Sequence, residues 1–162
     1  PILLILFFYS LLPSILNSLL QATSINVFDI PPIFYAFIIF SLMATASLSE
    51  IIRSAILTVD TGQLEAALSI GLSHFQAYRR IIFPQALKSA LPNLCNLVIN
   101  LVKGTSLVFV MTVKDITAIA KIEAAYGYQY FESYFVIFII YIIICRIIQL
   151  PFSWLENRAA IA

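Results

Sequence analysis

Charge is what this chain of 162 residues has least of. Asp, Glu, Lys and Arg together make up 10% of it, and the formal net charge is +1. Hydrophobic residues make up 62%, and the mean hydropathy is +1.01. These values lie far outside the range of soluble globular domains and predict a membrane protein. A net charge so close to zero gives no indication of a nucleic-acid partner, and we expect none.

Residues that build metal sites, disulfides and phosphate-binding loops are also scarce. The only histidine, His74, and the two cysteines, Cys95 and Cys145, have no metal-ligand spacing, and we expect the cysteines to be small buried hydrophobic residues. The four glycines are too scattered for a Gly-x-x-x-x-Gly-Lys-Ser loop. The chain also lacks a Ser/His, paired-Asp or His-Glu-x-x-His constellation. We therefore expect neither catalysis nor a cofactor bound directly to this chain.

Long runs without charge indicate how the chain crosses the membrane. Residues 1–28, 30–49 and 133–145 contain no charged side chain, and about twenty apolar residues in a helix cross a bilayer core of about 30 Å. We predict an all-α, polytopic membrane helical bundle with about four spans, at residues 1–20, 33–57, 84–113 and 131–150, and a charged outer loop at 114–130. The third span is longer than a bilayer requires, so it must tilt, extend or break, with Pro92 and Gly104 as the weak points.

The connecting segments have their own signals. A polar connector at 21–32 contains Asn26, Asp29 and the pair Pro31-Pro32, and we expect Pro151 to kink the last helix. Glu50 and Arg53 stand three residues apart near the end of the second span, so they can pair on one helix face. The chain opens at Pro1 directly into an apolar run, without the basic segment of a signal peptide, which predicts that an N-terminal portion is missing.

A polar island at residues 61–84 interrupts the apolar runs, and we expect it to form two short helices. The first carries an apolar stripe at helical spacing, made by Leu64, Ala67, Leu68 and Leu72. Gly71 then permits a turn or a close backbone approach, and Ser73 with Gln76 has the spacing of a capping box. Pro84 opens the third span. Within the same island, Glu65-Ala66-Ala67, Gly71, Ile81 and Phe83-Pro84 stand at fixed spacings.

That order resembles the EAA motif of ABC-importer permeases, with Phe83 in place of the consensus leucine. Further segments are similar to permeases of polar amino acid uptake, of the histidine, glutamine, arginine and cystine type; they are 49–56, 83–87, 103–107 and 113–117. The resemblance implies that residues 61–84 form a cytoplasmic coupling loop. The residues then expected to couple to the ATPase are Glu65, Ala66, Ala67, Gly71, Leu72, Ser73, Phe75, Gln76 and Pro84.

The resemblance also implies an assembly. Residues 1–162 would be the transmembrane domain of an ABC type I importer permease with five spans, lacking its N-terminal span. The expected partners are a second permease copy or paralogue, ABC ATPase subunits that hold ATP and Mg²⁺, and an extracellular binding protein or lipoprotein. The expected location is a bacterial cell membrane. Arg53, Arg79, Arg80 and Lys88 surround the island, and basic residues also flank the C-terminal end, so both should lie in the cytoplasm.

Lys103 is an ionisable residue among apolar ones, which makes it a candidate pathway residue. Asn96, Asn100 and Lys103 can share a helix face, followed by Gly104, Thr105 and Ser106. These groups could bind the carboxylate and amine of an amino acid; alternatively, Lys103 extends to the membrane interface and the asparagines tie helices together. No acid lies between Glu65 and Asp115, which favours a neutral or zwitterionic cargo. The similarity of the Lys-Gly-Thr-Ser-Leu form at 103–107 to the family makes cystine the first hypothesis. A permease for basic or other polar amino acids is the alternative.

Other interpretations stay open at this point. The island could lie on lipid headgroups as an interfacial helix. His74 could be an ordinary exposed side chain or could contact the ATPase. The whole protein could be a passive channel or a membrane scaffold, and association with an ATPase would separate these from an importer.

Overall fold

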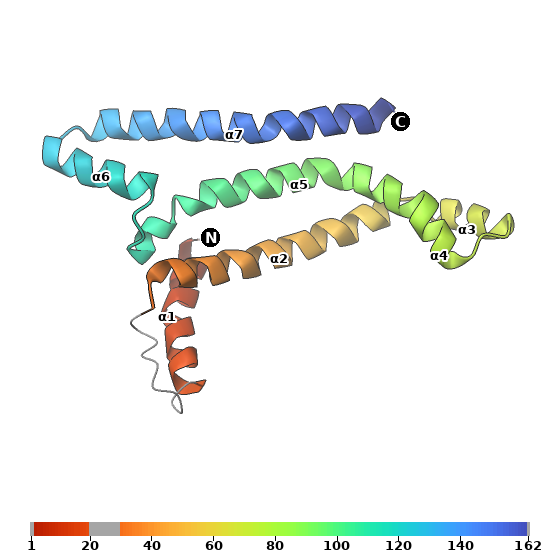
Figure 1. The fold of residues 1–162 in the computed structure, drawn as a ribbon, viewed down its shortest axis with the longest axis horizontal. Coiled ribbons are helices and arrows are strands. Elements are labelled where there is room, and N and C mark those ends of the chain that lie inside the picture. Colours follow the sequence, from red (N-terminus) through yellow and green to blue (C-terminus); the bar gives the residue numbers. More distant parts are fainter. Residues whose placement is uncertain (1, 20–29, 162) are drawn as a thin grey trace. The chain divides into compact units, whose positions relative to one another are not determined.

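The computed structural model describes residues 2–19 and 30–161 (Figure 1). All regular elements of this part of the chain are helical, which confirms the all-α prediction. Asn26 and Asp29 of the predicted connector, and Pro1, lie outside the described residues. The elements are α1 (Ile2–Leu19), α2 (Pro32–Thr58), α3 (Thr61–Ser69), α4 (His74–Ala77), the π-helical turn η2 (Tyr78–Ile82), α5 (Phe83–Thr105), the 3-10 turn η3 (Val108–Met111), α6 (Ile116–Gly127) and α7 (Tyr130–Ile161).

The chain divides into two compact units. The first comprises residues 1–44 and 100–144. Its core is formed by α1, the first half of α2 and η3, and the rings of Tyr9 and Tyr35 meet edge to face with their centroids 6.2 Å apart. The buried side chains of this core are Ile5, Tyr35, Ala36, Ile39, Val108 and Met111.

The second unit comprises residues 45–99 and 145–162. Its buried cluster is made of alanines, Ala55 on α2 and Ala86 and Ala90 on α5, with Ile51, Val59 and Leu94 packed around them. Small side chains of this kind let membrane helices approach closely. The elements α3, α4 and η2 of the polar island contact one another within this unit.

Two of the described helices are long and apolar enough to cross a membrane, Pro32–Thr58 and Tyr130–Arg158, and Ile2–Ser18 is a shorter apolar helix. The second and fourth predicted spans are therefore present as such helices. The fourth extends past its predicted end at residue 150, because α7 continues through Pro151. α5 contains Lys88, Lys103 and three asparagines, which lower its apolarity.

The third predicted span, 84–113, ends earlier than expected. α5 stops at Thr105, next to the predicted weak point Gly104, and runs unbroken through Pro92. The hydroxyls of Thr105 and Ser106 donate to the carbonyls of Val102 and Lys103, each at 2.7 Å. The backbone then tightens into η3, which ends at Thr112 in the left-handed region.

The prediction of an outer loop at 114–130 was wrong for most of that segment, because the segment contains α6. Asp115 caps this helix by accepting a hydrogen bond from the backbone N–H of Ala118 at 2.8 Å, and Tyr128, with φ 55°, ends it. Mixed charge and aromatic residues suggested a loop, but the segment between these two positions is rich in alanine and isoleucine and carries no helix breaker before Gly127.

Candidate functional site

The polar island is built from two capped helices and a left-handed glycine. Asp60 accepts a hydrogen bond from the N–H of Gly62 at 2.8 Å and so begins α3. At the other end, the N–H groups of Gly71 and Leu72 donate to the carbonyls of Leu68 and Ala67, the pattern of a Schellman motif. Gly71 has φ 84°, a conformation that glycine adopts without strain. The predicted turn at Gly71 is confirmed.

The predicted capping box is also confirmed. The hydroxyl of Ser73 accepts from the N–H of Gln76 at 3.3 Å, and the side chain of Gln76 accepts from the N–H of Ser73 at 3.0 Å. This reciprocal pair begins α4. α4 then passes into the π-helical turn η2, and Pro84 lies in the first turn of α5. Proline has no N–H to donate, and in an α-helix its ring clashes with the carbonyl four residues before it. The wider π-helical turn before Pro84 relieves this clash.

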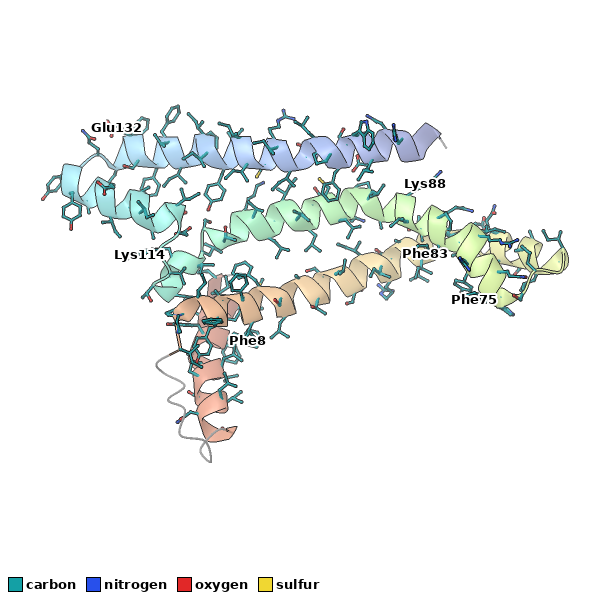
Figure 2. The ribbon with its side chains drawn as sticks, in the orientation of Figure 1. Phe8, Phe75, Phe83, Lys88, Lys114 and Glu132 are labelled. Carbon is teal, nitrogen blue, oxygen red and sulfur yellow. The ribbon has the colours of Figure 1, made fainter. Side chains whose placement is uncertain are left out.

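The apolar side chains of the island divide into an inner and an outer set. Ala67 on α3, Ala77 on α4 and Ile82 on η2 are buried, and Leu64, Leu68 and Leu72 are half-buried. The stripe predicted on the first helix therefore faces the island itself. By contrast, Ile70 and Phe75 are 77% and 73% exposed, and Tyr78 is exposed as well. Phe75 is labelled on α4 in Figure 2. We call Ile70, Phe75 and Tyr78 the island tip.

The other island residues singled out in the sequence are exposed and polar or small. Glu65, Ala66, Ser73, His74 and Gln76 are all exposed, and so is Pro84.

The predicted pair of Glu50 and Arg53 is present, with the Arg53 Nε atom 2.9 Å from Glu50 Oε2. Both side chains are more than half exposed, so this pair is a local feature of α2 and contributes little to stability.

A cavity of about 430 Å³ lies within the first unit. Its lining is almost wholly apolar and comes from the first half of α2, the end of α5 and the segment up to Asp115. The lining residues are Ile33, Ala36, Phe37, Phe40, Ser41, Ala44, Leu101, Val102, Thr105, Val108, Val113 and Asp115. Its volume lies in the range of about 300–1,000 Å³ typical of small-molecule sites.

Asp115 is the one acidic residue among those that line the cavity. Its Oδ1 atom caps α6, but its Oδ2 atom is buried and has no hydrogen-bond partner, and the same holds for the hydroxyl of Thr117. Buried polar atoms are nearly always paired, so an unpaired carboxylate oxygen beside a cavity is a candidate ligand contact. The sequence interpretation did not select Asp115 or Thr117, although an acid followed by an apolar helix marks an N-cap.

The residues predicted for a substrate pathway are only partly brought to this cavity. Thr105 lines it, and Gly104 packs beside it against the ring of Phe40, which also lines it. Asn100 and Lys103 are exposed and Ser106 is half-buried, and none of them lines the cavity. Asn96 is exposed and belongs to the second unit. The hydroxyls of Thr105 and Ser106 donate to carbonyls of α5.

Sequence and structure comparisons identify relatives of this chain. It is 48% identical over 101 residues to a protein named probable amino-acid permease protein YxeN of Bacillus subtilis strain 168, covering 62% of this chain and 45% of the relative. It is 37% identical to the L-cystine transport system permease protein TcyL of the same strain, covering 83% of this chain and 56% of the relative. The chain thus spans about half the length of these relatives.

A crystal structure described as an amino acid ABC transporter with histidines has the same fold, with a TM-score of 0.73 and 36% identity over 86% of this chain and 64% of that chain. Residues 1–161 match the family described as "Binding-protein-dependent transport system inner membrane component". The chain belongs to this family of membrane components of ABC transport systems.

Proposed function

We propose that this chain is part of the permease subunit of an ATP-driven amino acid importer, and that the island at 61–84 couples it to a cytoplasmic ATPase. Family membership and the names of the relatives support amino acid transport. ATP and Mg²⁺ belong to the ATPase in this proposal, and the chain itself performs no catalysis. A second permease copy or paralogue and an extracellular binding protein or lipoprotein complete the assembly.

The observation that carries the coupling proposal is the exposed island tip. Ala67, Ala77 and Ile82 already fill the interior of the island, so Ile70 and Phe75 are not needed to hold it together. Large apolar side chains on a short rigid helical element suit a groove on a soluble partner. Because α3 follows α2 directly and η2 leads into α5, a movement of the island is transmitted to both helices.

Replacement of Phe75 by alanine tests this proposal. We expect Phe75→Ala to weaken co-purification of the ATPase and to abolish stimulation of ATP hydrolysis by substrate-loaded binding protein. Leu87→Ala is the control, because Leu87 is a large apolar residue that is 48% exposed but lies on α5, outside the island. If both variants kept full coupling, the tip would not contact the ATPase. If both lost it equally, the effect would not be specific to the tip.

The alternative is that the island lies on lipid headgroups without an ATPase contact. In that case Phe75→Ala would change membrane association and leave ATP hydrolysis unaffected. A passive channel or scaffold is the other alternative, and amino acid uptake that continues without ATP would favour it. ATP-dependent uptake by the reassembled complex separates these cases from the importer.

The cavity supports an amino acid as cargo. The carboxylate of Asp115 can accept a hydrogen bond from an α-ammonium group, and the apolar lining suits an uncharged side chain. We therefore retain a neutral or zwitterionic amino acid, with cystine as the first hypothesis. The sequence argument rested on the absence of an acid in the third span; Asp115, outside that span, lines the cavity and supplies a carboxylate for the cargo's amine.

Gly104→Asp tests the cargo class. A second carboxylate beside the cavity should lower uptake of a neutral amino acid and should raise inhibition by arginine or lysine relative to cystine and glutamine, because a buried charge needs a partner. Gly104→Asn is the control, with nearly the same bulk and no charge. Identical competition profiles for the two variants would mean that charge at this position does not select the cargo.

A further inference from the structure

α6 presents an apolar face that none of the described residues of its unit covers. Ile116, Ile119, Ile122 and Tyr126 follow one another at intervals of three or four residues, so they lie on one side of the helix, and all four are exposed. The opposite side is buried through Thr117, Ala118 and Ala124. We call the exposed side the α6 outer face.

Lysine does not contribute to this face. The Nζ atom of Lys121 lies 3.8 Å from the centroid of the Phe109 ring, so the lysine of α6 is directed at its own unit. Glu123, four residues after Ile119, lies on the same side and is the one charged residue among the exposed residues of α6. Glu132 follows at the start of α7 (Figure 2). With Lys114 exposed just before the helix, the neighbourhood carries both charge signs and is not predominantly basic.

The aromatic character of the outer face continues past the helix. Tyr126 and Tyr128 are 83% and 87% exposed, and Tyr130 and Phe131 are exposed as well. Phe131 stacks on Phe135, one turn further along α7. Tyrosine rings are apolar with a polar tip, and they are enriched where membrane and water meet.

Connectivity places this corner near the end of a membrane span. α6 ends at Gly127 and α7 begins at Tyr130, and three residues of chain reach at most about 11 Å (Figure 1). α7 is one of the two apolar helices long enough to cross a membrane, and Ile137 is its one buried side chain among residues 130–158. The start of such a span lies at the membrane surface, so α6 cannot be far from it.

We propose that α6 lies in the interface of the membrane, with its outer face in contact with lipid and the tyrosines of the corner at the level of the headgroups. The occupant of the face is the lipid boundary, because the face is continuous in the chain with the exposed apolar surface of α7. With Glu123 and Glu132 nearby, association does not depend on anionic headgroups. This proposal depends on the membrane family of the chain and not on its cargo or its ATPase.

Spin labels on single cysteines test it in the complete permease complex, reconstituted in phosphatidylcholine vesicles after replacement of the natural cysteines by alanine. Labels at Ile119 and Ile122 report on the outer face, a label at Ala124 on the buried side, and a label at Gln129 on the turn. Collision with oxygen measures contact with lipid, and collision with a water-soluble nickel chelate measures contact with water.

The expected result is a loss of nickel collisions and a gain of oxygen collisions at Ile119 and Ile122 relative to Gln129, unchanged when phosphatidylglycerol is added. The label at Ala124 should be protected from both reagents. Nickel collisions at Ile119 and Ile122 equal to those at Gln129 would place the face in water. Protection of both labels from both reagents would place it against protein, either a second copy or the extracellular partner. Either result overturns the proposal.

Discussion

The ring of Phe40 lies directly against Gly104. Its Cε1 atom is 3.1 Å from the position that a Cβ atom would occupy at residue 104, which is closer than ordinary van der Waals contact. Phe40 comes from α2 and lines the cavity, whereas Gly104 is next to the last residue of α5. Glycine at this position therefore permits a close approach of the two helices beside the cavity.

Gly104→Ala should displace the Phe40 ring and destabilise the protein by about 1–3 kcal/mol, as overpacking does. Substrate binding should weaken with it, because the ring is part of the cavity wall. Phe40→Leu removes the obstructing atoms, so the loss caused by Gly104→Ala should shrink in that background. Thermal unfolding and substrate binding of the four proteins measure the coupling. Equal losses in both backgrounds would show that contact with Phe40 is not the reason for glycine.

Asp115 offers a cleaner test of the cavity, because asparagine can replace its capping function but not its charge. Asparagine is as good an N-cap as aspartate, whereas alanine costs about 1 kcal/mol. We expect Asp115→Asn to keep the stability of the protein and to lower substrate affinity, and Asp115→Ala to lower both. Calorimetric unfolding and equilibrium binding of labelled amino acids separate the two effects. Normal affinity in Asp115→Asn would remove Asp115 from the substrate site.

Local rules of backbone chemistry explain why the island could be predicted in detail. The helix starts at Ser73 and the turn at Gly71 depend on residues within a few positions of each other, and both are present as expected. The length of the third span left extension, tilt or a break open, with Pro92 and Gly104 as weak points, and the helix ends next to Gly104. Asp60 as the first cap was missed, although Asp followed by a helical run carries the same signal.

Contacts between distant segments explain what could not be predicted. The cavity depends on Phe40 and Asp115, which are 75 positions apart, and no periodicity within either segment indicates that they line the same space. The surface that covers the apolar stripe on α3 could not be predicted either. The residue pattern shows that one face of the helix is apolar, but it does not show what that face packs against. α6 was missed for a different reason, since its charges and tyrosines outweighed its alanine-rich helical pattern.

The proposed orientation predicts which ends of the helices face the cytoplasm. A cysteine at Ser73, in the island, should react only with a reagent added from the cytoplasmic side, and a cysteine at Gln129, between α6 and α7, only with one added from outside. Both positions are exposed. Labelling of right-side-out and inverted vesicles with a membrane-impermeant maleimide makes the comparison. The reverse pattern would contradict both the orientation and the contact of the island with an ATPase.

Substitutions at Gly71 can distinguish an effect on the stability of the island from an effect on its contact with a partner. Its φ of 84° strains any residue with a side chain by about 1–2 kcal/mol, and asparagine by less. Apart from its own chain neighbours, no atom of the described residues lies within 4 Å of a Cβ placed there, so the first carbon of a side chain meets open space. Gly71→Ala and Gly71→Trp should therefore have similar stability, while Gly71→Asn should be closer to the wild-type protein.

If the island enters a groove on the ATPase, Gly71→Trp should in addition abolish uptake and stimulation of ATP hydrolysis, with insertion into the membrane unchanged. Unfolding, ATPase assays and uptake for the three variants decide the point. Equal uptake by Gly71→Ala and Gly71→Trp would mean that no partner surface lies against this turn.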